Sequence, residues 1–159
     1  MALFDRLRRL VPGRTPAEPF ARGTHELERG QLDLAEIAFR SALAAASTAC
    51  APSPIAAARN KLAIVAIRRG DREAAVGELV LAFEADPRSP AAITTVGNLL
   101  LEDGCIDDAI AHYEYALLID QDYAPAYHNL GVAFHRAGRR REAVRMLRKA
   151  TRLEGRIKR

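Results

Sequence analysis

Residues 136–143 read RAGRRREA, and this polar glycine turn is the third of its kind in the chain. The two stretches that resemble it are RRGDREA at 68–74 and EDGCIDDA at 102–109. The glycines of the three turns follow one another at equal intervals, as Gly70, Gly104 and Gly138. A fixed period in the range of about 20 to 50 residues predicts a protein built from repeated structural units.

Small and large apolar residues recur at constant distances from each turn. Five and twelve residues after the glycine stands an alanine, nine residues after it a large apolar residue, and eight before it an apolar residue followed by a small one. These positions are Ala75, Ala109, Ala143; Ala82, Ala116, Ala150; Leu79, Tyr113, Leu147; Leu62, Val96, Leu130; and Ala63, Gly97, Gly131. Two antiparallel helices approach closely only where small side chains lie at their crossing. Each unit is therefore predicted to be a helix hairpin.

This pattern resembles the tetratricopeptide repeat, whose period of about 34 residues equals the interval between the turn glycines. The last unit matches best, with Gly155 in place of the closing proline; its matching positions are Tyr127, Leu130, Gly131, Phe134, Gly138, Ala143, Leu147 and Ala150. The middle unit has Ile93 at the leading aromatic position, and the unit around Gly70 has Arg59 there but keeps Pro87. The resemblance implies an all-α solenoid of antiparallel helix hairpins that forms a right-handed superhelix.

A degenerate repeat precedes these three. Gly30 with Ala35, Phe39 and Ala42 repeats the second half of the motif and Gly23 the small residue, whereas Pro19, Arg22 and Glu26 are unsuited to a core. The predicted organisation is an amphipathic segment 1–16, a first repeat 17–54 with an insertion, repeats 55–88 and 89–122, and a repeat with a basic capping helix, 123–159.

The interval from Gly30 to Gly70 is longer than the later intervals by six residues. The stretch AAASTACAPSP at 44–54 supplies the extra residues. It is expected either to add turns to the second helix or to form a loop ended by Pro52 and Pro54, since proline resists helix continuation. A tolerated insertion and a projection that binds a partner are both open.

In the family that the chain resembles, the first helix of each hairpin lines a concave groove that binds peptides. The groove candidates are Asn60, Lys61, Ile64, Arg68, Thr94, Thr95, Asn98, Glu102, His128, Asn129, Val132 and Arg136. Asn98 and Asn129 match positions that contact peptide backbone in peptide-binding members, and an asparagine amide offers such a backbone both a donor and an acceptor. Thr94 replaces the first lysine of the carboxylate clamp, so binding of chaperone tails is not predicted. The alternative is a merely solvated concave surface.

Charge is distributed unevenly along the chain. The third unit carries seven acidic residues, at Glu102, Asp103, Asp107, Asp108, Glu114, Asp120 and Asp122, and no lysine or arginine lies between Arg88 and Arg136. From Arg136 onward there are eleven basic residues. The predicted basic surface consists of Arg140, Arg141, Arg145, Arg148 and Arg152.

Three roles for this basic surface are open. The first is a polar cap on the last helix. The second is a docking surface for an acidic protein, such as the acidic repeat of another copy, and the third is a site for nucleic acid or anionic lipid. Nucleic acid is the least favoured, because the basic stretch lacks aromatic residues for base stacking.

The opening stretch MALFDRLRRLVPGRTP is predicted to be a short amphipathic helix. Leu3, Phe4, Leu7, Leu10 and Val11 fall on one helical face, before a proline and a glycine end the pattern. A helix of about eleven residues is marginal alone in water. It is therefore expected to cap the first repeat or to bind a membrane surface or another protein.

Composition and motifs exclude several classes of function. The absence of a phosphate loop, a nucleophile motif and a metal spacing argues against an enzyme and against a cofactor, and the histidines His112, His128 and His135 lack a carboxylate or cysteine at a convincing spacing. The two cysteines, Cys50 and Cys105, without a signal peptide, favour reduced thiols and the cytoplasm. The 21 arginines against 3 lysines suggest a bacterial genome.

The sequence thus predicts a non-catalytic adaptor or scaffold that binds a peptide or helix of a protein partner in its groove. The alternative is a structural protein that assembles with itself through contacts between the acidic repeat and the basic C-terminus, with membrane association through the N-terminal segment.

Overall fold

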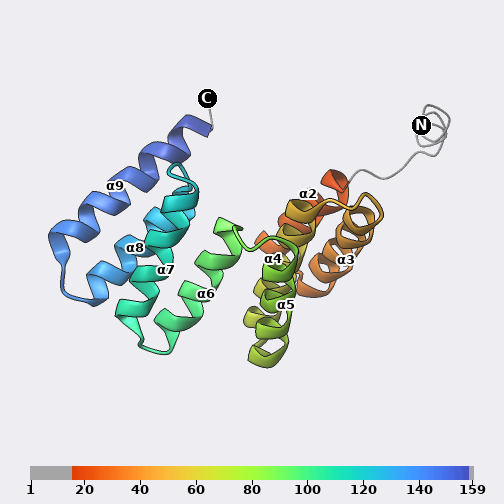
Figure 1. Ribbon diagram of the computed structural model, residues 1–159, viewed down its shortest axis with the longest axis horizontal. Helices are drawn as coiled ribbons and strands as arrows, with labels where there is room; N and C mark the ends of the chain where they lie inside the picture. Colours follow the sequence, from red (N-terminus) through yellow and green to blue (C-terminus); the bar gives the residue numbers. More distant parts are fainter. Residues whose placement is uncertain (1–15, 158–159) are drawn as a thin grey trace. The chain divides into compact units, whose positions relative to one another are not determined.

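The computed structural model describes residues 16–157, and these form eight helices and no strand (Figure 1). The helices are α2 (Ala17–Glu28), α3 (Leu32–Thr48), α4 (Pro52–Arg69), α5 (Arg72–Ala85), α6 (Pro90–Glu102), α7 (Ile106–Ile119), α8 (Ala124–Arg136) and α9 (Arg140–Ile157). The predicted all-α fold is confirmed. The amphipathic segment that the sequence predicts at the N-terminus lies outside the described residues, except for Pro16.

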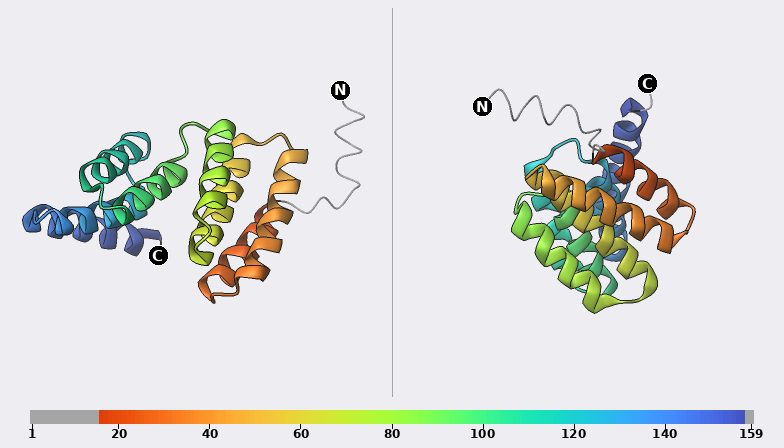
Figure 2. Two further views of the ribbon diagram at one scale, coloured as in Figure 1. Left: turned by 90° about the horizontal axis from the view of Figure 1, so that it is seen from below. Right: turned by 90° about the vertical axis from the view of Figure 1, so that its right-hand side faces the viewer.

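The helices divide between two compact units. The N-terminal unit, Met1–Asp86, contains α2 to α5, and the C-terminal unit, Pro87–Arg159, contains α6 to α9. Within each unit the helices pair into antiparallel hairpins, which Figure 2 shows from two further directions. The first helices of the two hairpins also touch, α2 against α4 in one unit and α6 against α8 in the other.

The glycines that set the period occupy the turns between paired helices. Gly70, Gly104 and Gly138 have φ angles of 78°, 81° and 76°, in the left-handed region where a Cβ atom is strained. In the first of these turns the Asp71 amide donates to the carbonyl oxygen of Ala66 at 3.0 Å, which satisfies a carbonyl that the helix end leaves open. The repeat period is therefore the spacing of turns that require glycine.

Small residues lie where the two helices of a hairpin cross. A Cβ atom on Gly97 would lie 2.6 Å from the Tyr113 ring, and one on Gly131 would lie 2.8 Å from Cγ of Leu147. The alanines five residues after each turn glycine are all buried, namely Ala75, Ala109 and Ala143. The close approach predicted from the small and large positions is present in the hairpins.

The six extra residues of the first interval lengthen helices instead of forming a long loop. Helix α3 runs on to Thr48 and α4 begins at Pro52, so that these helices have 17 and 18 residues against 12 in α2. Pro52 and Pro54 stand in the first turn of α4. Backbone N–H groups in a first turn make no hydrogen bond within the helix, so the N–H group that proline lacks is not needed there. Pro19 is likewise in the first turn of α2 and is buried, which differs from the expectation that it does not suit a core.

Candidate peptide-binding site

Two asparagine side chains join the first helices of the C-terminal unit. Asn98 lies on α6 and Asn129 on α8, and Nδ2 of Asn129 donates a hydrogen bond to Oδ1 of Asn98 at 2.7 Å. The hydroxyl of Tyr113, on α7, donates to the same oxygen at 2.9 Å. Three helices therefore hold the amide of Asn98 in one orientation.

This orientation leaves specific hydrogen-bonding groups unused. Oδ1 of Asn98 accepts both bonds, and among residues 16–157 the Nδ2 group of Asn98 has no acceptor and Oδ1 of Asn129 has no donor. Both side chains are half-buried. One donor group and one acceptor from neighbouring helices are the groups that an extended peptide backbone can pair with.

Tyr113 supports this arrangement from α7. Its side chain has no exposed area, and burial raises the pKa of the phenol to about 12, while the nearby Arg136 lowers this pKa and Glu102 raises it. The hydroxyl consequently stays protonated, and can donate to Asn98, far above neutral pH. Sequence reasoning placed Tyr113 only in the core. The sequence did contain a signal for this role. Tyr113 carries a hydroxyl at a repeat position where the other two units have Leu79 and Leu147, so packing alone does not require a tyrosine there.

Charged residues flank the asparagine pair at the ends of the same helices. Glu102 is exposed at the end of α6, and Nη1 of Arg136, in the last turn of α8, donates to the carbonyl oxygen of Leu101 at 2.9 Å. The bond fastens α8 to the end of α6. His128 is exposed and Val132 half-buried on α8, so both helices contribute predicted groove residues to this region.

The two threonines predicted to line the groove are buried. Thr95 donates to the carbonyl oxygen of Ala91 at 3.0 Å within α6, and Oγ1 of Thr94 has no hydrogen-bond partner among residues 16–157. Neither side chain is exposed to a ligand in this conformation.

The predicted groove residues of α4 lie in the other unit and serve mainly to pack it. Asn60 is buried, Ile64 packs against the core around Phe39, and Lys61 is half-buried, with its pKa lowered by that burial although Glu28 opposes the shift.

Arg68 fastens α4 to α2. Its Nη1 donates to the carbonyl oxygen of Leu27 at 2.6 Å. This contact repeats that of Arg136 with Leu101, and the two arginines stand two periods apart in the sequence. Their structural role could have been recognised from this spacing.

The predicted basic surface follows one side of α9. Arg140, Arg141, Arg145, Arg148 and Arg152 are all exposed. Four of them line a depression of about 470 Å³ together with Val144 and Lys149. Its lining comes from a single helix, so it is a shallow charged face and not an enclosed pocket.

Part of the basic charge is balanced inside the C-terminal unit. Arg139 bonds the carboxylate of Glu142 with two nitrogens and lies over the Phe134 ring, 4.2 Å from its centre. The hydrogen bond from Arg139 lowers the pKa of Glu142. Lys149 lies 3.9 Å from Asp122. The acidic and basic stretches that the sequence separates therefore meet in part within one unit.

The histidines do not assemble into a cluster with other ligands. No group of three or more histidine, cysteine or acidic residues that could hold a metal ion occurs in the part of the chain that the structure describes. His112 contacts the Asp108 carbonyl oxygen at 2.9 Å, while His128 and His135 are exposed. Among the helices described, none combines the length and the apolar character needed to cross a membrane.

The stacked hairpins and their glycine-spaced turns define the class of helical repeat proteins. The pattern of the family described as TPR repeat matches residues 97–138, and that described as Tetratricopeptide repeat matches 124–156. Residues 97–156 therefore contain tetratricopeptide repeats, and the predicted resemblance is confirmed. No curated protein matches the chain.

Solved structures show the same fold at low sequence identity. The structure of PilF from Pseudomonas aeruginosa has a TM-score of 0.66 and 24% identity, covering 87% of this chain and 60% of that one. A structure of MamA has a TM-score of 0.58 and 22% identity, covering 96% and 85%. A structure of YrrB, described as a TPR protein with an unusual peptide-binding site, has a TM-score of 0.55 and 21% identity, covering 97% and 76%. The chain therefore spans 60% of the length of PilF.

Proposed function

We propose that this protein is a non-catalytic adaptor that binds an extended peptide of a partner protein along α6 and α8. The observation that carries the proposal is the hydrogen-bonded amide pair of Asn98 and Asn129, with a donor and an acceptor left unused. The fold supports the proposal, since YrrB, which shares it, is described as having a peptide-binding site.

Recognition follows from the chemistry of the amides. A peptide backbone presents one N–H and one C=O per residue whatever its sequence, so paired asparagines provide affinity without side-chain selectivity. Selectivity comes from Glu102 and Arg136 at the ends of the two helices and from Val132 on α8. Because Tyr113 and Asn129 orient the Asn98 amide before a ligand arrives, little side-chain entropy is lost on binding.

Asn129→Ala tests this proposal most cleanly. The full chain is used to select binders from a random peptide library, and the affinity of the selected peptides is measured by calorimetry. Asn129→Ala should weaken binding by about 1–3 kcal/mol, or roughly 5- to 150-fold, because a ligand N–H loses its acceptor. Asn98 keeps its bond from Tyr113 in this variant, so the fold persists.

Gln121→Ala is the control, since Gln121 is an exposed amide in the loop before α8. It should leave the affinity unchanged. If peptides bind the parent and the Asn129→Ala variant equally well, they dock elsewhere and the proposed site is wrong.

The exposed arginines of α9 support a second candidate function, self-assembly of the basic end of one copy with the acidic repeat of the next. Such a contact is screened by salt. Arg145→Glu with Arg148→Glu should lower the apparent mass in size-exclusion chromatography at low ionic strength. Arg22→Glu with Arg29→Glu alters two exposed arginines of the N-terminal unit by the same total charge and should not. An apparent mass that is independent of salt and equal in all three proteins would exclude this assembly.

A further inference from the structure

The N-terminal unit contains an apolar pocket that the proposed function does not use. Its volume is about 360 Å³, and its lining consists of Pro16, Ala17, Phe20, Ala42, Pro54 and Ala57. All six residues are apolar. A cavity of roughly 150 Å³ holds a benzene ring, so this pocket has room for two side chains of that size.

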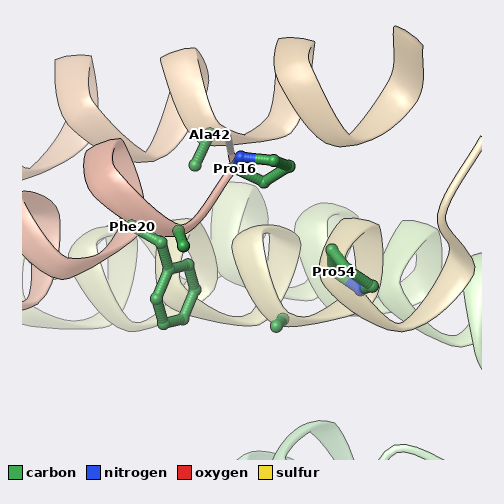
Figure 3. Close-up of a pocket in the computed structure, with 6 residues that line it drawn as sticks. Pro16, Phe20, Ala42 and Pro54 are labelled. Carbon is green, nitrogen blue, oxygen red and sulfur yellow. The ribbon is translucent and has the colours of Figure 1, made fainter. Parts of the chain in front are cut away.

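The insertion between Gly30 and Gly70 builds one wall of the pocket. Pro54 belongs to the inserted stretch and lies in the first turn of α4, Ala42 lies on α3, and Pro16 and Phe20 lie where α2 begins. Figure 3 shows Phe20 and Pro54 on either side of the open space and Ala42 with Pro16 above it. Because α2 is shorter than α3 and α4, residues 16–157 leave apolar surface of the two longer helices uncovered beside the first turn of α2.

Phe20 forms the inner side of the pocket and is held in place. Its ring packs edge-on against Phe39, with 5.6 Å between the ring centres, and Phe39 has no exposed area. Phe20 itself is half-buried, so one side of the ring remains open toward the pocket. An apolar surface held in this way and exposed to water favours an apolar occupant.

We propose that the occupant is the N-terminal segment of the same chain, residues 1–15. This segment ends at Pro16, which is itself part of the pocket wall, so its apolar residues are tethered beside the site. The apolar face predicted from its sequence consists of Leu3, Phe4, Leu7, Leu10 and Val11. Four residues separate Val11 from Pro16, and such a connection spans at most about 14–18 Å when extended, so a reversal at Pro12 and Gly13 can bring that face over the pocket.

Tethering decides between this occupant and others. A segment joined by a short linker has a millimolar effective concentration at its site, whereas a separate peptide or a second copy must compete at its much lower free concentration. The apolar residues of the segment and the apolar lining of the pocket cover each other. The docked segment caps the first repeat at its N-terminal side.

Protection of a thiol placed in the pocket tests this inference. In a background in which the exposed Cys50 and Cys105 are replaced by serine, Ala57→Cys is introduced and its labelling rate with maleimide is measured in the full chain. Leu3→Glu, Leu7→Glu and Leu10→Glu together should raise the labelling rate at least tenfold. The matched control, Arg6→Glu with Arg8→Glu and Arg9→Glu, changes the charged face and should preserve protection.

Other occupants give different results. Equal labelling of the parent and the apolar-face variant would show that the segment does not cover the pocket. Protection that disappears on dilution would assign the pocket to the segment of a second copy. Protection that is lost when vesicles of phosphatidylglycerol and phosphatidylcholine are added would show that the segment prefers a membrane.

A disulfide provides a second test that does not depend on the glutamate variant. Leu7→Cys with Ala57→Cys, in the same background, should form an intramolecular bond under mild oxidation and run as a monomer without reductant. Leu3→Cys and Leu10→Cys are each combined with Ala57→Cys in the same way. If none of the three pairs forms an intramolecular disulfide, the proposed docking is wrong.

Discussion

Replacing Tyr113 with alanine should lower the free energy of unfolding of the C-terminal unit by roughly 3–5 kcal/mol, as for other large aromatic side chains removed from a core. The ring has no exposed area, and it fills the space that Gly97 leaves at the crossing of α6 and α7. The variant also removes the hydroxyl that orients Asn98. A tightly packed interior relaxes only partly around such a cavity, so most of the cost remains.

Urea unfolding followed by tyrosine fluorescence measures this cost in the relevant unit. All four tyrosines of the chain lie between Pro87 and Arg159, so their fluorescence reports on the C-terminal unit alone, and three remain in the variant. Circular dichroism reports on both units together. A midpoint that is unchanged by Tyr113→Ala would show that the ring does not pack as described.

A double-mutant cycle with Gly97→Ala tests the contact itself. In the parent, the new methyl group would overlap the Tyr113 ring, and the overpacking should cost about 1–3 kcal/mol, partly offset by the gain of up to about 1 kcal/mol that alanine brings to a helix interior. In the Tyr113→Ala background the ring is absent, and the same substitution should be stabilising. Gly155→Ala, on α9 with no atom within 4 Å of the added group, is the control and should not destabilise either background. Additive effects would contradict the direct contact.

Replacing Asn98 with alanine should destabilise the C-terminal unit by about 1–3 kcal/mol, the usual cost of a buried polar group left without a partner. Asn98 accepts the bond from the buried Tyr113 hydroxyl as well as the bond from Asn129. A side chain that only contacted a ligand would leave the free energy of unfolding nearly unchanged when it is replaced by alanine. The structure changes that expectation because the side chain also completes the interior of the unit.

Asn129→Ala is the comparison, since it removes a donor and leaves Tyr113 bonded to Asn98. It should cost less than about 1 kcal/mol of stability, so the two asparagines should separate clearly in unfolding experiments. Equal destabilisation by the two variants would mean that the Tyr113 hydroxyl finds another partner and that the bond to Asn98 matters little.

The hairpins could be predicted from sequence because their determinants lie at fixed distances along the chain. A turn glycine needs a left-handed backbone, and the two helices that it joins need a small residue at their crossing, so Gly104 and Gly97 recur as Gly138 and Gly131. Each requirement involves residues of one hairpin. The repeat period was therefore enough to predict the hairpin fold, including the burial of Ala109 and Ala143.

The candidate site could be predicted only in part. Helical position correctly placed Asn98 and Asn129 on the first helices of adjacent hairpins, but Thr94 and Thr95 are buried there, and Asn60 is buried on α4. The packing of neighbouring helices decides how far a polar residue at such a position is covered. A helical pattern records which face a residue is on and does not record how closely the next helix approaches.

The sequence by itself determined the repeat period, the glycine turns and the class of protein, since these follow from backbone conformation and from contacts within a hairpin. The tertiary structure decided that the inserted stretch lengthens α3 and α4 and leaves an apolar pocket, and that Tyr113 bonds to Asn98. It also decided the pairing of Asn98 with Asn129, 31 residues apart in different hairpins. The physical reason is that such a bond requires two helices to stack at one particular distance and both side chains to adopt compatible rotamers, and no regularity in the sequence encodes either condition.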